Sequence, residues 1–152
     1  VGYDEAQAQA AAEEGVQLAL DWRSQFEVPQ SSLDVLTQLG ERVPLVAITN
    51  GNVDLDKIGL TPYFQCVLKA GPDGLAKPAT DMFTKAKRFL DIPAENILHV
   101  GDHLTTDVHG AKSAGFAACW INDMNKNVIN HSKTRTLPDI EINSLQPLLT
   151  LF

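Results

Sequence analysis

The sequence predicts an α/β fold with three layers, in which helices cover both sides of a doubly wound parallel sheet. Apolar runs at residues 44–49, 96–100 and 116–121 show no alternation of polar and apolar side chains, which is typical of strands buried on both faces. Segments of helix length separate these runs, as right-handed βαβ crossovers require. The chain has 152 residues, the size of one domain.

Two helices are expected before the first of these strands. Residues 4–24 are rich in Ala, Glu and Gln and contain no proline, which favours a single helix. A break follows, after which Ser31 or Ser32 is a suitable N-cap for a second helix. Gly40 is a typical residue for the end of that helix.

Strands and helices alternate through the rest of the chain. The expected strands are rich in apolar residues and cover 44–49, 66–68, 96–100 and 116–121. The expected helices lie between them, at 54–58, 79–90 and 106–114. The last part is less regular, with a polar loop over 122–138, a short edge strand at Ile140 and Ile142, and a terminal helical turn within 145–152.

Composition and charge exclude several classes of protein. Lys and Arg number 12 against 19 Asp and Glu, and the resulting net charge of −7 repels nucleic acid. The longest apolar stretches fall far short of the ~20 residues of a membrane span. Cys66 and Cys119 lie in apolar runs, where a reduced buried thiol is usual. No secretory signal follows Val1, so we expect a cytoplasmic protein.

The ends of the strands carry the candidate functional residues, because ligands of an open α/β sheet bind beyond the carboxyl ends of its strands. Thr49, Asn50 and Gly51 offer a hydroxyl, an amide and a backbone that can turn its N–H groups toward an anion. An ordinary turn is the alternative. Lys77, before Pro78 and a helix start, is suited to a phosphate oxygen, although an isolated lysine is more often a solvated surface residue.

A further strand end carries two acids, Asp102 and Asp107. Two carboxylates that face one crevice repel each other, and a hard cation such as Mg²⁺ offsets that repulsion by coordination. The alternative is structural, with Asp102 or Thr105 as a helix cap and Asp107 as an acid that complements the helix dipole. We expect His99 to be a hydrogen-bonded core residue and His103 to be polar surface.

Taken in order, these three sites resemble motifs two, three and four of the haloacid dehalogenase-like hydrolases. The motifs are a strand ending in Thr-Asn-Gly, a later Lys-Pro before a helix, and a strand ending in Gly-Asp-x-x-x-x-Asp, and here they span residues 45–107. A more specific likeness is to the bacterial YigB-type phosphatases, which act on flavin mononucleotide and on the phosphorylated ribitylaminouracil intermediate of riboflavin synthesis. It rests on residues 22–24, 45–52, 69–72 and 97–108.

The resemblance implies a Rossmann-like core and a Mg²⁺-dependent phosphomonoester hydrolase that forms an aspartyl-phosphate and acts on a small phosphorylated metabolite. It assigns binding of the phosphoryl group to Thr49, Asn50, Gly51 and Lys77. Asp102 would be a ligand of Mg²⁺, and Asp107 would hold the metal shell or Lys77 in place. These roles neutralise charge and position groups, which is most of what phosphoryl transfer requires.

The family's first motif is missing from this sequence. It places Asp-x-Asp-x-Thr or Asp-x-Asp-x-Val after an apolar strand, supplies the nucleophile, and should precede motif two. Only a partial spacing occurs, at Asp54 and Asp56, and it comes too late in the chain. We therefore expect residues 1–27 to be the remnant of a helical cap and residues 28–152 to be an incomplete core that is inactive alone.

The resemblance implies that the missing strand lies in the middle of the sheet, between the strands that end at Thr49 and at Gly101, so two apolar strand edges would be left unpaired. A separate amino-terminal segment or self-association would complete the sheet. Two other functions stay open. One is dehalogenation. That reaction needs no cation, so the pair of carboxylates at Asp102 and Asp107 is evidence against it. A non-catalytic module that binds phosphate and Mg²⁺ without turnover is the other.

Overall fold

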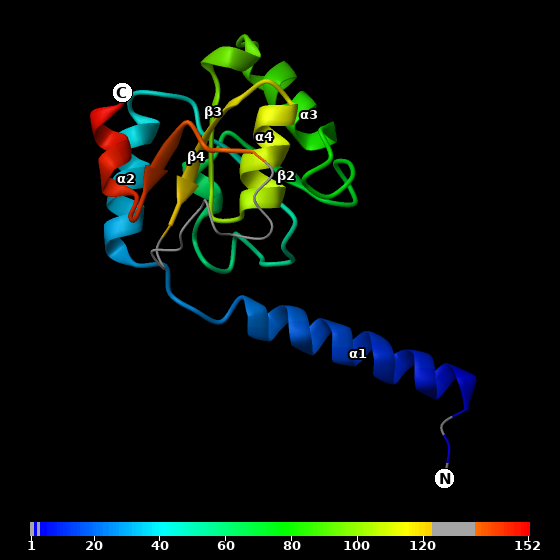
Figure 1. Ribbon diagram of the computed structural model, residues 1–152. Coiled ribbons are helices and arrows are strands. Elements are labelled where there is room, and N and C mark those ends of the chain that lie inside the picture. Colours follow the sequence, from blue (N-terminus) through cyan, green and yellow to red (C-terminus); the bar gives the residue numbers. More distant parts are fainter. Residues whose placement is uncertain (1, 3, 123–135) are drawn as a thin grey trace.

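The computed structural model describes residues 2, 4–122 and 136–152, and it confirms an α/β fold with parallel strands (Figure 1). The strands are β1 (Val46–Thr49), β2 (Cys66–Lys69), β3 (Leu98–Gly101), β4 (Ala117–Ile121) and β5 (Ile140–Ile142). The α-helices are α1 (Glu5–Arg23), α2 (Gln30–Gly40), α3 (Asp81–Leu90) and α4 (Gly110–Ser113). A π-helix, η3 (Leu104–His109), precedes α4, and short 3₁₀ turns are η1 (Thr61–Tyr63), η2 (Ala94–Asn96) and η4 (Gln146–Thr150).

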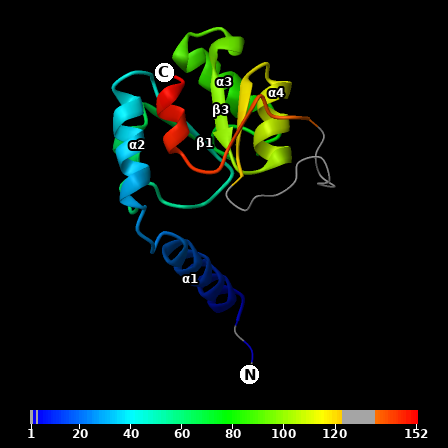
Figure 2. The ribbon, with the colours of Figure 1, turned by 60° about the vertical axis from the view of Figure 1, so that its left-hand side comes forward.

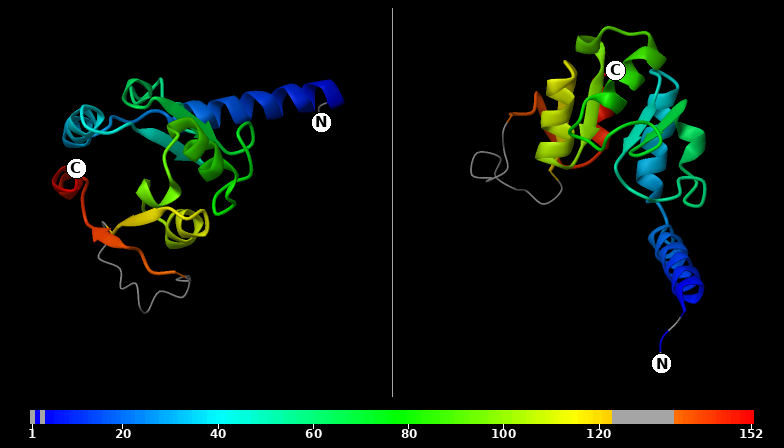
Figure 3. Two further views of the ribbon diagram at one scale, coloured as in Figure 1. Left: turned by 90° about the horizontal axis from the view of Figure 1, so that it is seen from above. Right: turned by 90° about the vertical axis from the view of Figure 1, so that its right-hand side faces the viewer.

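The strands form two separate parallel sheets. β1 pairs with β2, while β4 lies between β3 and β5. Within the described residues no ladder joins β1 to β3, and Figure 3 shows the two sheets as distinct halves of the molecule. The sheet is thus interrupted at the place where the sequence predicts an absent strand.

Helices cover both faces of the sheets, which gives the expected three layers. On one face, α3, η3 and α4 bury a core against β4; its members are Phe83, Leu104, Val108, Ala111, Phe116, Ala118 and Trp120. On the other face, α2 and η4 pack around Cys119. Burial raises the pKa of the Cys119 thiol to about 11, so this thiol is protonated at neutral pH and belongs to the core.

An apolar cavity of about 360 Å³ lies between the open edges of β1 and β3. Alternate residues of a strand point their backbone groups to opposite sides. The Thr49 carbonyl accepts from the N–H of Ala70 (3.0 Å), and the Ile97 carbonyl accepts from the N–H of Ala117 (3.0 Å). Those carbonyls face the neighbouring strands β2 and β4. In β1 and β3, the residues that alternate with Thr49 and Ile97 therefore direct their N–H and C=O groups toward the cavity. They are Val46, Ile48, Leu98 and Val100.

Helix α1 extends away from the rest of the molecule (Figures 1 and 2), and none of its residues is buried. Two contacts anchor its carboxyl end. The Ser24 hydroxyl accepts from the N–H of Asp54 (3.0 Å), and Lys57 Nζ pairs with Asp21 (2.5 Å). The assignment of residues 1–27 to a cap remnant stays a prediction. Neither α1 nor another helix in the described part of the chain is apolar and long enough to cross a membrane.

Two of the expected local structures are wrong. Residues 54–58 form turns and no helix, since the Asp54 carboxylate accepts from the N–H of Asp56 (3.0 Å) and Gly59 takes a φ of 71°. A separate helix this short forms too few hydrogen bonds to offset the conformational entropy lost in its first turn. Helix α2 begins at Gln30 with Pro29 at the N-cap, so Ser31 and Ser32 lie inside its first turn and do not cap it.

The carboxyl-terminal elements agree with the sequence. The predicted edge strand is β5, and the predicted terminal turn is the 3₁₀ turn η4. Most of the polar loop expected over 122–138 lies outside the described residues.

Candidate active site

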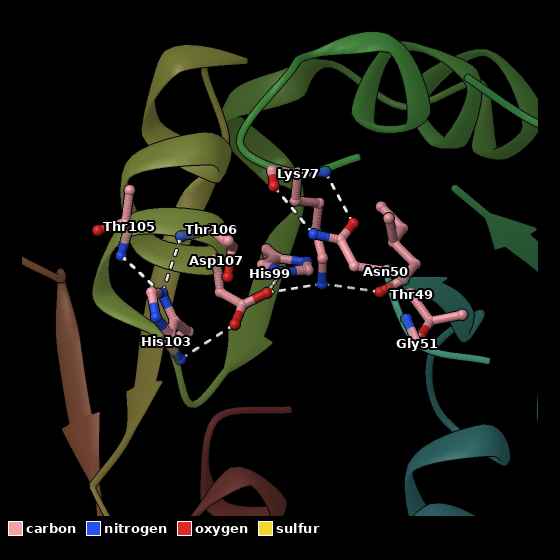
Figure 4. Close-up of polar contacts among 10 residues, drawn as sticks. Thr49, Asn50, Gly51, Lys77, His99, His103, Thr105, Thr106 and Asp107 are labelled. Atoms are coloured by element: carbon pink, nitrogen blue, oxygen red, sulfur yellow. Dashed lines mark hydrogen bonds and ion pairs between the residues drawn. The ribbon is translucent and has the colours of Figure 1, made fainter. Parts of the chain in front are cut away.

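The loops that follow β1 and β3 meet at the carboxyl ends of these strands, and the segment before α3 reaches the same place (Figure 4). Figure 4 shows Lys77 between two groups, with Thr49 and Asn50 on one side and His99 and Asp107 on the other. These residues come from three distant parts of the chain. The fold therefore brings together the strand-end residues that the sequence singled out.

Asn50 holds the backbone of Lys77 at two points. Its Oδ1 accepts from the Lys77 N–H (2.7 Å), and its Nδ2 donates to the Lys77 carbonyl (2.9 Å). The next peptide bond, Lys77–Pro78, is cis. On the other side of Asn50, the Thr49 hydroxyl accepts from the N–H of Gly51 (2.9 Å). The amide of Asn50 is thus used to orient Lys77, a contact that the sequence did not predict.

The Lys77 ammonium group lies at the centre of the site. It donates to the carbonyl of Ile48 (2.8 Å) on the open edge of β1 and to Asp107 Oδ1 (2.6 Å). The Lys77 side chain is only 11% exposed and that of Asp107 only 7%, so the surface-lysine interpretation is wrong. An ammonium group has three hydrogens, and two of them are used within the described residues, which leaves one for a ligand.

Both oxygens of the Asp107 carboxylate contact groups of the protein. Oδ1 accepts from Lys77 and also contacts His99 Nε2 (3.1 Å), while Oδ2 accepts from the N–H of His103 (3.0 Å). Burial alone would raise the pKa of Asp107, but hydrogen bonds from His99 and Lys77 hold it well below its usual value. Asp107 is therefore ionised at neutral pH and keeps its negative charge against Lys77.

Glycines make room for this arrangement. A Cβ on Gly101 would lie 2.5 Å from Asp107 Cβ and 2.7 Å from its Oδ2. A Cβ on Gly110 would lie 3.1 Å from Pro78 Cα, so glycine there lets α4 pack against the segment that carries Lys77. The Gly-Asp at the end of β3 is thus needed because the Asp107 side chain folds back over the strand end.

The π-helix η3 is capped by a histidine. His103 Nδ1 accepts from the N–H groups of Thr105 and Thr106 (3.2 Å each). The helix begins at Leu104, two residues before the expected start, and neither Asp102 nor Thr105 caps it. His103 is exposed, as expected of polar surface, and its ring has the additional role of capping η3. Histidine is not among the preferred N-cap residues, so this role could not be predicted from the residue type.

Asp102 lies directly after β3 and is exposed. Its backbone carbonyl accepts from Trp120 Nε1 (3.0 Å), which fixes the loop. Its carboxylate has no partner among residues 4–122 and 136–152, and these residues contain no group of three His, Cys, Asp or Glu that could hold a metal. Mg²⁺ is usually held by one or two carboxylates together with waters and substrate phosphate. The chain thus fits Mg²⁺ with one carboxylate, from Asp102.

Comparison with known proteins identifies the family. A model of the haloacid dehalogenase-like hydrolases matches residues 3–115. The YigB phosphatase of 5-amino-6-(5-phospho-D-ribitylamino)uracil from Escherichia coli is 48% identical over 86% of this chain and 55% of its own length. The human N-acylneuraminate-9-phosphatase is 31% identical over 77% of this chain and 48% of its own length.

Solved structures lead to the same family. A 2-haloacid dehalogenase from Pseudomonas syringae has a TM-score of 0.88 and 35% identity, covering 99% of this chain and 64% of that one. The HAD-hydrolase YfnB from Bacillus subtilis, solved bound to magnesium, has a TM-score of 0.70 and 28% identity, covering 81% of this chain and 55% of that one. The chain spans about half the length of the curated relatives it matches. Over that span, this chain belongs to the haloacid dehalogenase-like hydrolases.

Proposed function

We propose that this chain forms the phosphate- and magnesium-binding part of a phosphomonoester hydrolase. The observation that carries the proposal is the buried Lys77 ammonium group, which two acceptors hold at the carboxyl ends of β1 and β3 with one hydrogen left for a ligand. A fixed positive charge at a dry strand end is suited to the negative charge of a transferring phosphoryl group. The hydroxyl of Thr49 and the backbone of Gly51 lie beside it (Figure 4).

Asp102 would hold Mg²⁺ in this proposal. Its carboxylate is exposed at the end of β3, where it is accessible to a cation and its waters. The bound ion would supply charge neutralisation at the phosphate oxygens. Asp107 would act differently, because its two oxygens already accept from Lys77, His99 and His103; its role would be to hold Lys77. The magnesium-bound structure of YfnB supports the choice of ion.

The nucleophile of the proposed reaction comes from outside this chain. The cavity between β1 and β3 is apolar, and both of its long sides are strand edges that present backbone N–H and C=O groups. We propose that a strand carrying the family's first motif, Asp-x-Asp, inserts there parallel to both neighbours. The carboxyl end of that strand would then arrive between Thr49 and Asp102, beside Lys77. Its first aspartate would attack the phosphorus atom.

The proposed substrate is a small phosphorylated metabolite. The name of the Escherichia coli relative states a phosphatase for 5-amino-6-(5-phospho-D-ribitylamino)uracil. We propose this intermediate of riboflavin synthesis, or flavin mononucleotide, as the substrate class for this chain, and we place the enzyme in the cytoplasm. The two free cysteines are in keeping with that compartment.

Dehalogenation is the second candidate, because a structure titled 2-haloacid dehalogenase is 35% identical to this chain. That reaction attacks carbon, develops no phosphate charge and needs no cation. The exposed carboxylate of Asp102 would have no role in it. We therefore favour the phosphatase, and the two reactions differ in a direct assay.

The experiment combines this chain with a segment of the Escherichia coli relative that carries the first motif; this combination is called the completed protein below. Phosphate release from p-nitrophenyl phosphate and halide release from 2-chloropropionate are measured with Mg²⁺ and with a chelator. The proposal expects phosphate release that requires both polypeptides and Mg²⁺. Halide release in the presence of the chelator would support the dehalogenase. Phosphate binding without any hydrolysis would instead identify a non-catalytic module.

A further inference from the structure

His99 is a titratable side chain of the site that contacts Asp107, and neither the family motifs nor the proposed function gives it a role. It lies in β3, its side chain is 11% exposed, and its Nε2 is 3.1 Å from Asp107 Oδ1. Its ring meets the edge of Phe83 of α3, with centroids 5.0 Å apart and an angle of 77° between the planes. The ring is therefore fixed on one side by apolar packing and on the other by a carboxylate.

The oxygen that His99 contacts is the one that holds Lys77. Asp107 Oδ1 lies 2.6 Å from Lys77 Nζ and 3.1 Å from His99 Nε2. The other oxygen, Oδ2, accepts from the backbone of His103 at 3.0 Å. Without His99, the carboxylate would keep one contact on each oxygen and could rotate about its Cβ–Cγ bond. With His99, Oδ1 has two donors from different elements, and its position is determined.

The chemistry of the groups fixes the direction of this hydrogen bond. The Asp107 carboxylate is ionised and can only accept, so the hydrogen must be on Nε2 of His99. In Figure 4 the His99 ring and the Lys77 ammonium group both lie next to the Asp107 carboxylate. A displacement of the carboxylate would move the ammonium group with it, because the ion pair is buried.

We infer that His99 is a positioning residue: it donates from Nε2 to Asp107 and thereby sets where the Lys77 ammonium group stands. The inference rests on the proposed function for its kinetic consequence, since Lys77 acts there on the phosphoryl group. At metal sites, loss of a partner that orients a ligand typically costs about 10–100-fold in activity, and we expect a loss of the same order for a partner that orients Lys77. The loss falls on kcat, because the charge that Lys77 neutralises develops in the transition state.

The test compares two substitutions of His99, one that removes the hydrogen-bond donor and one that keeps it. His99→Phe keeps an aromatic ring against Phe83 but has no donor. His99→Gln keeps an N–H donor at a similar distance from the backbone. His109→Phe is the control, because His109 is also half-buried and hydrogen-bonded, but its Nδ1 contacts Thr136 (2.8 Å) and not the site.

The first readout is NMR on this chain, and it needs no activity. Ring ¹H–¹⁵N correlations should place the His99 hydrogen on Nε2, and the Lys77 ammonium signal should be visible because its hydrogens are held. His99→Phe should lose the Lys77 signal, whereas His99→Gln and His109→Phe should keep it. A His99 ring with no hydrogen on Nε2, or a Lys77 signal that survives in folded His99→Phe, would overturn the inference.

The second readout is kinetic, on the completed protein with p-nitrophenyl phosphate. His99→Phe should lower kcat by about 10-fold or more with little change in KM, and His99→Gln should recover most of the loss. Equal kcat values for wild type and folded His99→Phe would contradict the inference. If the wild type shows no turnover, the proposed function fails, and the NMR result alone decides on His99. If His99→Phe does not fold, the wild-type tautomer and the His99→Gln variant still decide.

Discussion

Lys77 is the residue on which the proposed chemistry depends most. The sequence pattern predicted that Lys77 binds phosphate, but it could not predict the contacts that hold its side chain. The motif Lys-Pro before a helix indicated a phosphate site. The distance from Lys77 Nζ to the Ile48 carbonyl (2.8 Å) and the two-point contact with Asn50 depend on loops that are 27 or more residues apart. His99 is a hydrogen-bonded core residue, as the sequence predicted. Its partner Asp107 and the capping role of His103 were not predicted, because histidine in a strand or loop carries no specific signal.

Lys77→Ala should reduce the turnover of the completed protein by about 10²-fold or more, because it removes a fixed charge from the transition state. Hydrolysis of p-nitrophenyl phosphate measures the change, and circular dichroism checks that the variant is folded. Lys85→Ala is the matched control, since Lys85 is an exposed lysine that pairs with Asp73 away from the site (3.4 Å). Equal turnover for Lys77→Ala and Lys85→Ala would remove Lys77 from the proposed role.

Asp102→Asn should abolish Mg²⁺-dependent turnover, because an amide is a poor replacement for the exposed carboxylate that would hold the ion at the end of β3. The variant should fold normally, since the Asp102 carbonyl and not its side chain holds Trp120. A titration of activity against Mg²⁺ concentration measures the effect. Retained activity at low Mg²⁺ would show that Asp102 is not a ligand.

Asp107 should make the stability of the chain depend on acid pH. Its pKa in the fold lies below the ordinary value of 3.8, so its stabilisation is complete above that value and is lost as the pH falls toward the lowered pKa. We expect the free energy of unfolding, measured with urea, to be lower at about pH 3 than at about pH 5 in the wild type. The same decrease should be smaller in Asp107→Asn. The same decrease in both proteins would mean that Asp107 is not stabilised by Lys77 and His99.

At the scale of the elements, the sequence predicted the strands well because each is a continuous apolar run between polar turns. The helices were less certain at their ends. η3 begins as a π-helix under a histidine cap, and residues 54–58 form turns. Local hydrogen bonds that backbone N–H groups donate to the side chains of His103 and Asp54 determine these starts. Such bonds depend on side-chain geometry, which periodicity does not encode.

Gly101→Ala tests how β3 and η3 fit together. The added Cβ would lie 2.5 Å from Asp107 Cβ, so the Asp107 side chain must shift at a cost of about 1–3 kcal/mol in the free energy of unfolding. Gly40→Ala is the control, since its Cβ would meet only Leu45 Cδ1 at 3.9 Å. Chemical denaturation measures both variants. If Gly101→Ala is as stable as Gly40→Ala, Asp107 does not lie over the strand end as described.

At the scale of the whole molecule, the site is divided between the two sheets, with Ile48 in β1 of one sheet and Asp107 after β3 of the other. Lys77 is the residue whose side chain links them, through Ile48 of β1 and Asp107 after β3. Absence of the first motif from the sequence predicted this interruption, because the resemblance to the haloacid dehalogenase-like hydrolases implies that the strand of that motif lies between the other two. The cavity that results could not be sized without the structure.

The most direct test of this account is backbone hydrogen exchange on the chain, alone and with the segment that carries the first motif. The amides of Val46, Ile48, Leu98 and Val100 point into the cavity, so we predict that they exchange quickly in the chain alone and become protected when the segment is added. Ala47 and His99, whose amides face β2 and β4, should be protected in both samples. Binding of the segment with no new protection at the four cavity-facing amides would contradict the account.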